Sequence, residues 1–469
     1  MAQTQIRAGT REWTALAVLV LPCLVVSMGS NVLHLALPAI SEQLRPTNAQ
    51  LLWIVDGYVF LLAALSTTPQ MLVAARMLLG VAGATLMPST LSLIRSMFAD
   101  ARQRSTALGV WTASFALGGV IGPVVGGLLL GAFWWGSVFV VAVPVMLLLV
   151  VLGPRLLPEF RDEDAAPVDL RSAGLSVVAV LLVVYGVTRL AESGAGAEPL
   201  VTLVVGSAAG VGLLTRQRTH PTFGLELFRR RTFALPVATN AIAFFVLYGM
   251  QFLLAQYLQL VLGLSPLEAG LWTIPSALGY LAGSVAAPRV AHRLLPGAAL
   301  AACLVVSALG FALLVPVPNG GGLPLYVVAS VILSFGLAPV YVVATGLAVS
   351  AAPVRQAGRA SALLETCTNL GGALGIAVLG SVAGVVFRDG MSQPPPSGVP
   401  DDAWQAAHGT LGRAIDVARD LPPAAAGELL DAARGAFGQA FQSTQLLGAV
   451  LLGLSAVAVA VLLRRVPGR

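Results

Sequence analysis

Apolar runs long enough to cross a lipid bilayer recur from Trp13 to Leu463, and they constrain the fold more than any other feature. Most connections between these runs are short and polar. A membrane-spanning helix needs about 20 mainly apolar residues, whereas a barrel strand gives a shorter, alternating pattern. The runs are long and continuous, so the sequence predicts an all-α integral membrane protein.

The composition and the charge agree with this class. Hydrophobic residues make up 57% of the 469 residues and charged residues 10%, far outside the range of soluble domains. The net charge is +6, and all 27 basic residues are arginines. They cluster at the ends of the apolar runs instead of forming one basic face. We therefore expect contact with membrane lipids and no nucleic-acid partner.

We predict about 12 full transmembrane helices plus one partial or re-entrant segment. The full spans lie near 14–38, 71–94, 105–131, 137–157, 172–190, 199–215, 233–262, 267–288, 297–316, 323–349, 357–386 and 441–463. The partial segment, residues 51–66, has only about 16 residues and contains Asp56, so it is marginal for a helix that crosses the bilayer.

The arginines indicate how the chain is oriented. If residues 51–66 do not cross, 20 arginines face the cytoplasm, 6 lie outside and Arg76 lies in the membrane. If they do cross, the count becomes 7 inside and 19 outside. Arginine-rich loops stay in the cytoplasm, so the first arrangement is favoured. Both termini are then cytoplasmic, and residues 51–66 enter and leave on the outer side.

The predicted organisation has three parts. Residues 1–157 form an N-terminal bundle that is shortened near 51–70, and residues 158–231 form a linker with two additional central spans. Residues 232–469 form a C-terminal bundle with an outer loop at 387–440. Ala-rich stretches at 402–419 and 424–438 predict a helical hairpin on the outer face, either a lid, a spacer or simple packing.

Carboxylates inside apolar runs point to function. Asp56 and Glu365 lie well inside such runs, and Glu268 lies at the edge of another. A charge at the bilayer centre costs about 2.5–3.5 kcal/mol on insertion scales, so such residues are usually retained for proton, ion or substrate handling. The chain is therefore a candidate for transport.

Glu365 is the best candidate for a proton site. It lies about eight residues into its span, roughly 12 Å along the helix axis, and it shares a polar stripe with Ser361, Asn369 and Gly372. A carboxyl in this position could take up and release a proton or bind a cation. The alternative is a neutral carboxyl that is hydrogen-bonded within the helix bundle.

Three other polar residues within apolar segments could support proton coupling. Asp56 and Arg76 could pair, because a buried arginine without acceptors is costly; alternatively, Asp56 is an interfacial acid. His34 lies near Asn31 on the first span, and imidazole titrates near neutral pH. A neutral histidine bonded to a neighbouring span is the alternative for His34.

The segment ALGGVIGPVVGG is the strongest motif. Gly118, Gly122 and Gly126 recur every four residues and so share one helix face, which Gly127 adjoins. Small residues let another helix approach closely, and Pro123 removes a backbone donor and bends the span. Such a face could rock or slide during gating, or it could serve packing alone.

These motifs resemble the major facilitator superfamily. The glycine motif is similar to the antiporter signature in the fifth span of its exporters, and LVAARMLLGVAGATLMPSTLSLI is similar to its fourth-span arginine motif. LLWIVDGY and ASALLETCTNLGGALGIAVLGS resemble the fourteen-span drug:proton antiporters, of the quaternary-ammonium and methyl-viologen exporter type. The resemblance implies a proton-coupled multidrug exporter of the cell (inner) membrane that works by alternating access.

The chain departs from that family pattern near Ala63 and Ala64. It lacks the cytoplasmic loop that family members carry between the second and third spans, as if about thirty or more residues had been removed there. It also has Gly29 where family members usually place an aspartate in the first span. The alternative to an active exporter is therefore a transport-inactive, internally truncated protein of the same family.

The span at 233–262 offers a wall for a substrate cavity. Aromatic faces attract lipophilic cations and amides adapt to varied polar groups, although a lipid-facing aromatic set is an alternative for about half of these residues. The proposed substrate-binding residues are Asn240, Phe245, Tyr248, Gln251, Phe252 and Tyr257. The expected partners are small lipophilic or cationic substrates and protons, and the expected state is a monomer.

Enzymatic chemistry is not expected. The sequence shows no set of nucleophile, base and acid, no phosphate-binding loop and no cluster with metal-ligand spacing, so neither a cofactor nor a metal is predicted. Cys23, Cys303 and Cys367 are interpreted as small buried residues.

Overall fold

In the computed structural model the described residues are mostly helical and include no β-strand. These are residues 9–44, 63–78, 90, 93–94, 97–98, 100–156, 169–193, 196–219, 224–317, 322–353, 356–396 and 398–463. The prediction of an all-α protein is confirmed for this part of the chain.

The chain divides into two compact units. The first comprises Met1–Pro167 and Leu264–Ile274, and the second comprises Val168–Gly263 and Pro275–Arg469. The boundaries predicted at 157 and 231 divide the chain by the order of its spans, whereas the two units are defined by contacts in space. The three-part organisation therefore stays a prediction.

In the first unit, α1 packs lengthwise on α5 and also contacts α7. The side chain of Asp100 caps α5 by accepting a hydrogen bond from the backbone N of Gln103 at 2.8 Å. The labelled helices of this unit are α1 (Thr10–Leu44), α5 (Ala101–Ala132), α6 (Ser137–Val140) and α7 (Ala142–Leu156), and the first part of α11 (Pro266–Arg293) also belongs to it.

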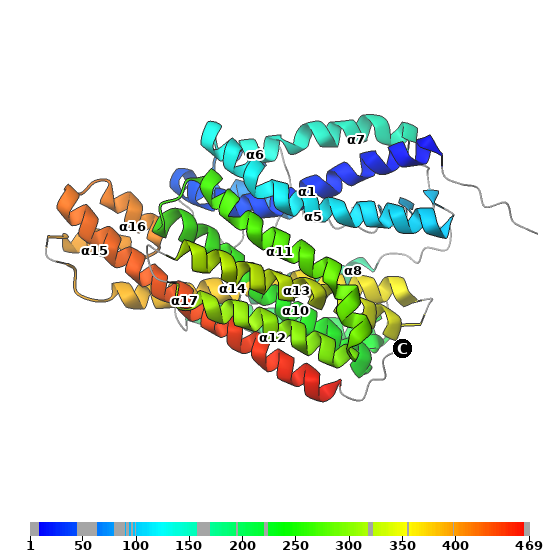
Figure 1. Ribbon diagram of the computed structural model, residues 1–469. Helices are drawn as coiled ribbons and strands as arrows, with labels where there is room; N and C mark the ends of the chain where they lie inside the picture. The colour runs from blue at the N-terminus through cyan, green and yellow to red at the C-terminus, as the bar shows by residue number, and fades with distance from the viewer. Residues whose placement is uncertain are drawn as a thin grey trace, which may run out of the picture. The chain divides into compact units, whose positions relative to one another are not determined.

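The second unit holds the other labelled helices, among which α10 packs on α14, α12 on α13 and on α17, and α14 on α17 (Figure 1). The elements before α11 are α8 (Leu170–Ser193), α9 (Ala197–Thr219), η1 (Leu225–Arg229), α10 (Arg231–Gln256) and the π-helical turn η2 (Tyr257–Val261). Those after it are α12 (Pro296–Leu314), α13 (Leu323–Ala351), α14 (Ala357–Met391), α15 (Asp401–Ala407), α16 (Leu411–Ala418) and α17 (Pro423–Leu462).

Seven helices among the described residues are long and apolar enough to cross a membrane. They cover Arg171–Leu190, Ala197–Gln217, Arg231–Val261, Pro296–Leu314, Leu323–Ala351, Arg359–Met391 and Pro423–Leu462. Six of them coincide closely with spans expected from the sequence, and the seventh, Pro423–Leu462, contains most of the span expected at 441–463. Helices α1, α5, α7 and α11 overlap four more expected spans. Most of the segment 51–66, including Asp56, lies outside the described residues.

Two boundaries differ from the expectation. The span expected at 137–157 is interrupted at Val141, between α6 and α7. Residues 424–438, expected in the outer loop, instead begin α17, because this stretch contains no proline or cap that would separate it from the last span. The stretch 402–419 forms two short helices, and the Thr410 side chain caps the second by accepting from the backbone N of Arg413.

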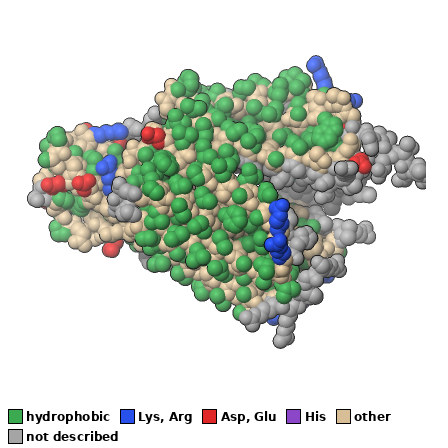
Figure 2. All heavy atoms as spheres, viewed as in Figure 1, with side chains coloured by type: hydrophobic (Ala, Val, Ile, Leu, Met, Phe, Trp, Pro, Cys, Tyr) green, Lys and Arg blue, Asp and Glu red, His purple; other side chains and the backbone are tan. Residues whose placement is uncertain are grey.

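The described surface is that of a protein in lipid. Hydrophobic side chains cover most of the visible face, and charged ones gather towards helix ends, including the end formed by α15 and α16 (Figure 2). On α17 the exposed apolar residues recur at helical spacing along one face: Leu446, Val450, Leu454, Val457 and Val461. Such a face suits acyl chains, whereas in water it would be a large exposed patch.

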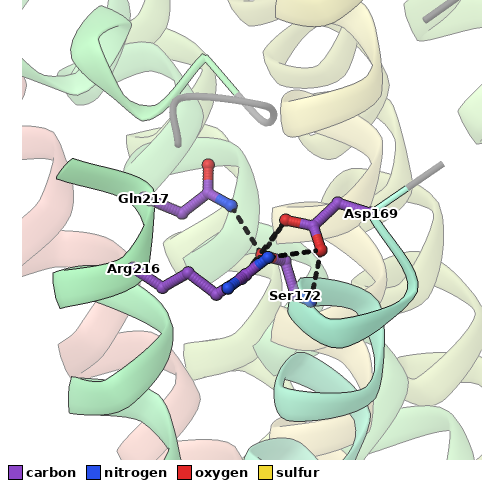
Figure 3. A network of polar contacts seen from close by, with 4 residues as sticks. All are labelled: Asp169, Ser172, Arg216 and Gln217. Carbon is purple, nitrogen blue, oxygen red and sulfur yellow. Dashed lines mark hydrogen bonds and ion pairs between the residues drawn. The ribbon is translucent and has the colours of Figure 1, made fainter. Parts of the chain in front are cut away.

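The pair α8 and α9 forms a hairpin that polar side chains join at both ends. At one end Arg216 and Gln217 of α9 meet Asp169 and Ser172 at the start of α8 (Figure 3). At the other end the Tyr185 hydroxyl donates to Glu198 at 2.6 Å and accepts from Arg189 at 3.0 Å.

Glycines let the two helices of this hairpin pack closely between their ends. A Cβ on Gly186 would lie 2.7 Å from Leu203, and one on Gly206 would lie 2.9 Å from Leu182. Of the two helices, α8 is the one that packs against α14.

Candidate functional site

Glu365 lies in the second unit on an exposed polar stripe of α14. Ser361, Thr366 and Asn369 are exposed on this helix and Glu365 itself is half-buried. The side-chain amide of Asn369, one turn later, donates to Glu365 Oε1 at 3.3 Å. A polar stripe within a membrane-length helix is unfavourable against hydrocarbon, so it favours contact with water or a polar ligand.

Two tyrosines from other helices of the same unit face the Glu365 carboxyl. Tyr341, on α13, and Tyr280, in the part of α11 that belongs to this unit, both lie close enough to this carboxyl to interact with its charge. Glu365 therefore sits where three helices bring polar groups together.

A row of aromatic rings extends from this carboxyl to α10. The Tyr341 ring lies 5.6 Å from the Phe244 ring, and Phe244 lies 5.7 Å from Tyr248 in an edge-to-face arrangement. Tyr248 in turn lies against Gly372 on α14, where a side chain would collide with its ring. Aromatic faces beside a carboxylate form a suitable environment for an organic cation.

A buried hydrogen bond from Asn240 also joins α10 to α14. Its Nδ2 donates to the Thr368 hydroxyl at 2.6 Å, and that hydroxyl donates to the Leu364 carbonyl. Asn240 is fully buried, and within the described residues its Oδ1 has no hydrogen-bond partner. A buried acceptor of this kind is costly unless something donates to it.

The other proposed substrate-binding residues on α10 and η2 do not gather with this group. Phe245 and Gln251 are half-buried, whereas Phe252 is buried. Tyr257 is buried and its ring stacks on Phe441 of α17 at 4.6 Å. The position of Tyr257 favours packing, so its binding function stays a prediction without structural support.

The glycine motif lies where α5 packs closely on two neighbours within the first unit. A Cβ on Gly118 would lie 2.5 Å from the Leu24 carbonyl of α1, and Gly122 faces Met28 of the same helix. Further along, Gly127 faces Leu267 at the start of α11, and Gly270 of that helix meets Pro123. Gly126 is buried on the same helix.

Arg76 is buried in the first unit, with its guanidinium 5.7 Å from the centre of the Phe139 ring. Asp56 lies outside the described residues, and so does the His34 side chain, although the backbone of His34 belongs to α1. The proposed pairing of Asp56 with Arg76 and the proposed function of His34 therefore stay predictions.

Sequence reasoning missed Tyr341 and Tyr280 as neighbours of Glu365. A signal existed for the tyrosines, because the chain has only 7 and these two lie mid-span. Their convergence on one carboxyl depends on the relative rotation of three helices, which hydropathy does not encode.

Comparisons with known proteins agree with the fold. The sequence model of the Major Facilitator Superfamily matches residues 49–376. The chain resembles a crystal structure of a bacterial homolog of the human lysosomal transporter Spinster, with a TM-score of 0.66, 17% identity and coverage of 97% of this chain and 98% of that one. The predicted membrane fold is confirmed.

Curated relatives are export and resistance proteins. The chain is 37% identical to the multidrug efflux pump LfrA of Mycolicibacterium smegmatis, with 98% of each chain covered. It is 31% identical to the methyl viologen resistance protein SmvA of Salmonella typhimurium, over 91% of this chain and 93% of the relative. It is 28% identical to the tetracenomycin C resistance and export protein of Streptomyces glaucescens, over 96% and 91%.

The first of these alignments also shows that this chain lacks residues that its relative has. It extends over 494 positions, but 98% of 469 residues is only about 460. About 34 positions therefore have no residue in this chain. That number matches the size of the segment predicted to be missing near Ala63 and Ala64.

Proposed function

The chain belongs to the major facilitator superfamily, and from this premise we propose that it is a multidrug efflux transporter that exports lipophilic cations in exchange for protons. The names of its relatives support the efflux part of the proposal. Proton coupling and the cationic class of substrate rest on the residues around Glu365.

The single observation that carries the proposal is the position of the Glu365 carboxyl on the exposed polar stripe of α14. Keeping a carboxylate at this depth of a membrane helix costs free energy, so its retention favours a function in transport. The same carboxyl lies beside the aromatic row Tyr341–Phe244–Tyr248, which provides attraction for a cation.

Competition at one carboxyl gives a simple basis for exchange. A proton on a Glu365 oxygen neutralises the charge that a cation needs, and a bound cation stabilises the ionised form. The carboxyl would thus bind either ligand but not both. If it is exposed alternately to the two sides of the membrane, inward movement of protons drives outward movement of the cation.

Other parts of the proposal rest on the sequence and on packing. The arginine distribution supports cytoplasmic termini in the inner membrane of the cell, and a monomer is expected. The closely packed glycine face of α5, with Gly118, Gly122, Pro123, Gly126 and Gly127, is proposed to serve gating, because small residues let helices shift against each other.

Proteoliposomes with an imposed pH gradient test the proposal. Wild-type protein should export a lipophilic cation such as tetraphenylphosphonium, and Glu365→Gln should abolish this flux. Glu268→Gln is the matched control, because Glu268 instead binds Ser265 at the start of α11 and should retain activity. Export that is equally coupled to protons in Glu365→Gln would overturn the assignment of this residue.

A transport-inactive protein of the same family is the second candidate. The observation that favours it is the set of about 34 alignment positions without a residue in this chain. This candidate predicts that wild-type protein moves no substrate in the same proteoliposomes, with or without a pH gradient.

A further inference from the structure

We propose that Gly263 and Pro275 form a two-point hinge that lets the two units of the chain move relative to each other. Besides Met1–Pro167, the first unit includes Leu264–Ile274. The chain therefore leaves the second unit directly after Gly263 and returns to it at Pro275. Each crossing point carries a residue with special backbone properties. This inference concerns movement and not the binding site, so it goes beyond the proposed function.

Gly263 has a backbone conformation that glycine adopts easily and other residues do not. Its φ is +69°, in the left-handed region, and a Cβ built on it would meet no atom of the described residues within 4 Å. Two more described glycines, Gly224 and Gly398, have a positive φ, but both lie inside the second unit. Gly263 differs from them because it lies where the chain crosses between units, with open space beside it.

The chain before Gly263 is held to the second unit by α17. The Tyr257 ring, in the π-helical turn η2, stacks on the Phe441 ring at 4.6 Å with an angle of 15° between the planes. The Nε of Arg434 donates to the Leu260 carbonyl at 3.3 Å. The last carbonyls of a helix lack partners within the helix, so this arginine also satisfies an acceptor at its end. These contacts fix the chain almost up to Gly263.

The chain after Gly263 is held by the first unit. The backbone N of Ser265 donates to Glu268 Oε2 at 2.9 Å, and the backbone N of Glu268 donates to the Ser265 hydroxyl at 3.2 Å. This reciprocal cap fixes the start of α11. In the same turn Leu267 packs so closely on Gly127 of α5 that a Cβ on this glycine would lie 2.5 Å from the Leu267 Cα. Rotation between the two held segments is therefore concentrated around Gly263.

Pro275 lies where α11 returns to the second unit. Proline has no backbone N–H, so the helical hydrogen bond to the Leu271 carbonyl cannot form, and helices bend readily at such positions. Directly after it, the hydroxyls of Ser276 and Ser334 lie 2.7 Å apart and join α11 to α13. The helix is thus held on both sides of the proline, by a different unit on each side, and the weak point lies between them.

Pulsed electron–electron double resonance on the purified full-length chain in lipid bilayers tests the hinge. Spin labels at Phe133 and Glu428, which are exposed residues of the first and second unit, report the distance between the units after the three native cysteines are replaced by alanine. Wild type should show two distance populations. Gly263→Ala should change their ratio about tenfold, because the cost of a Cβ in the left-handed region falls on only one of the two conformations. Gly263→Asn should change it less than about threefold, because asparagine tolerates this region.

Gly224→Ala is the matched control. Its φ of +73° is nearly the same, but it lies within the second unit, so the ratio should stay within about twofold of wild type. A single distance in wild type, or equal shifts in Gly263→Ala and Gly224→Ala, would overturn the hinge. Should Gly263→Ala fail to fold, Pro275→Ala restores the missing donor and should change the ratio at least about threefold; an unchanged ratio would then overturn the inference.

Transport of tetraphenylphosphonium in proteoliposomes separates this inference from the proposed function. If wild type shows two distances that respond to Gly263→Ala but exports no cation, the proposed function fails and the hinge stands. If wild type exports the cation while Gly263→Ala keeps the wild-type ratio of distances, only the hinge fails.

Discussion

Arg216 binds both carboxylate oxygens of Asp169 and thereby ties the end of α9 to the start of α8. Its terminal nitrogen lies 3.0 Å from Asp169 Oδ1, and its Nε lies 3.3 Å from Oδ2. The same Nε approaches the hydroxyl of Ser172 at 3.1 Å, and Ser172 also donates to Asp169. The hairpin is therefore closed by a planar, two-pronged contact that only an arginine can make.

Replacing Arg216 should loosen the hairpin even where the charge is kept. Arg216→Lys retains the positive charge but loses the two-pronged geometry, so thermal unfolding of the purified protein should begin at a lower temperature than for wild type. Arg189→Lys is the control, because Arg189 is more exposed and lies 3.8 Å from Glu198. A larger effect at Arg189 than at Arg216 would contradict this ranking.

The stabilisation by Asp169 should depend on pH in the acidic range. Hydrogen bonds from Ser172 and then the guanidinium of Arg216 hold the pKa of Asp169, which precedes the span of α8, well below its ordinary value. The pKa of Asp169 is lower in the folded protein than in the unfolded chain, where it is about 4. The stabilisation by Asp169 is therefore fully present above about pH 4, and it is lost as the pH falls from there towards the pKa of the folded state.

Melting temperatures of wild type and Asp169→Asn test this dependence. Their difference should be constant from about pH 7 to about pH 5 and should shrink below about pH 4. Asp416→Asn, at a more exposed pair with Arg419, is the control. A difference that grows as the pH falls would show that the sign is wrong.

The Asn240–Thr368 pair should behave as a coupled unit. Thr368→Val removes the acceptor of the buried Asn240 amide and should cost about 1–3 kcal/mol of unfolding free energy. Replacing both residues, with Asn240→Leu and Thr368→Val, should cost less than the sum of the single changes, because no buried polar group is left unpaired.

Transport by the same variants tests whether Asn240 binds substrate. If its buried Oδ1 accepts a hydrogen bond from the ligand, Asn240→Leu raises the KM for export while Thr368→Val leaves it nearly unchanged. Equal changes in KM for both variants would assign Asn240 to packing alone.

Glycines on α14 should differ sharply in their tolerance of a methyl group. A Cβ at Gly375 would collide with the Phe245 carbonyl and lie 2.7 Å from the Phe245 Cα, so Gly375→Ala should destabilise the protein by about 1–3 kcal/mol. Gly384→Ala, on the same helix, meets only the flexible Arg388 side chain at 3.5 Å. It should be neutral or stabilising, because alanine favours the helix.

Hydropathy located the helices, but it could not locate their contacts. The seven apolar helices coincide with spans expected from the sequence, because length and apolarity are properties of one segment. The Gly118 face was recognised because its spacing of four encodes a packing surface. Tyr341 was missed because its position near Glu365 depends on how α13 is rotated relative to α14, and no local pattern fixes that rotation.

Restoring the missing segment should distinguish the two proposed functions. Ala63 and Ala64 are buried and adjacent, and Ala63 accepts a backbone hydrogen bond from Ser66 in a turn. The alignment with the efflux pump LfrA has about 34 positions without a residue in this chain, and the sequence predicts the loss here. We expect cells that express the chain as it stands to resist a lipophilic cation more than cells that express Glu365→Gln. If resistance appears only after a family-like segment is inserted between Ala63 and Ala64, the chain as it stands is the inactive form. In that case, adding Glu365→Gln to the restored chain should abolish the resistance.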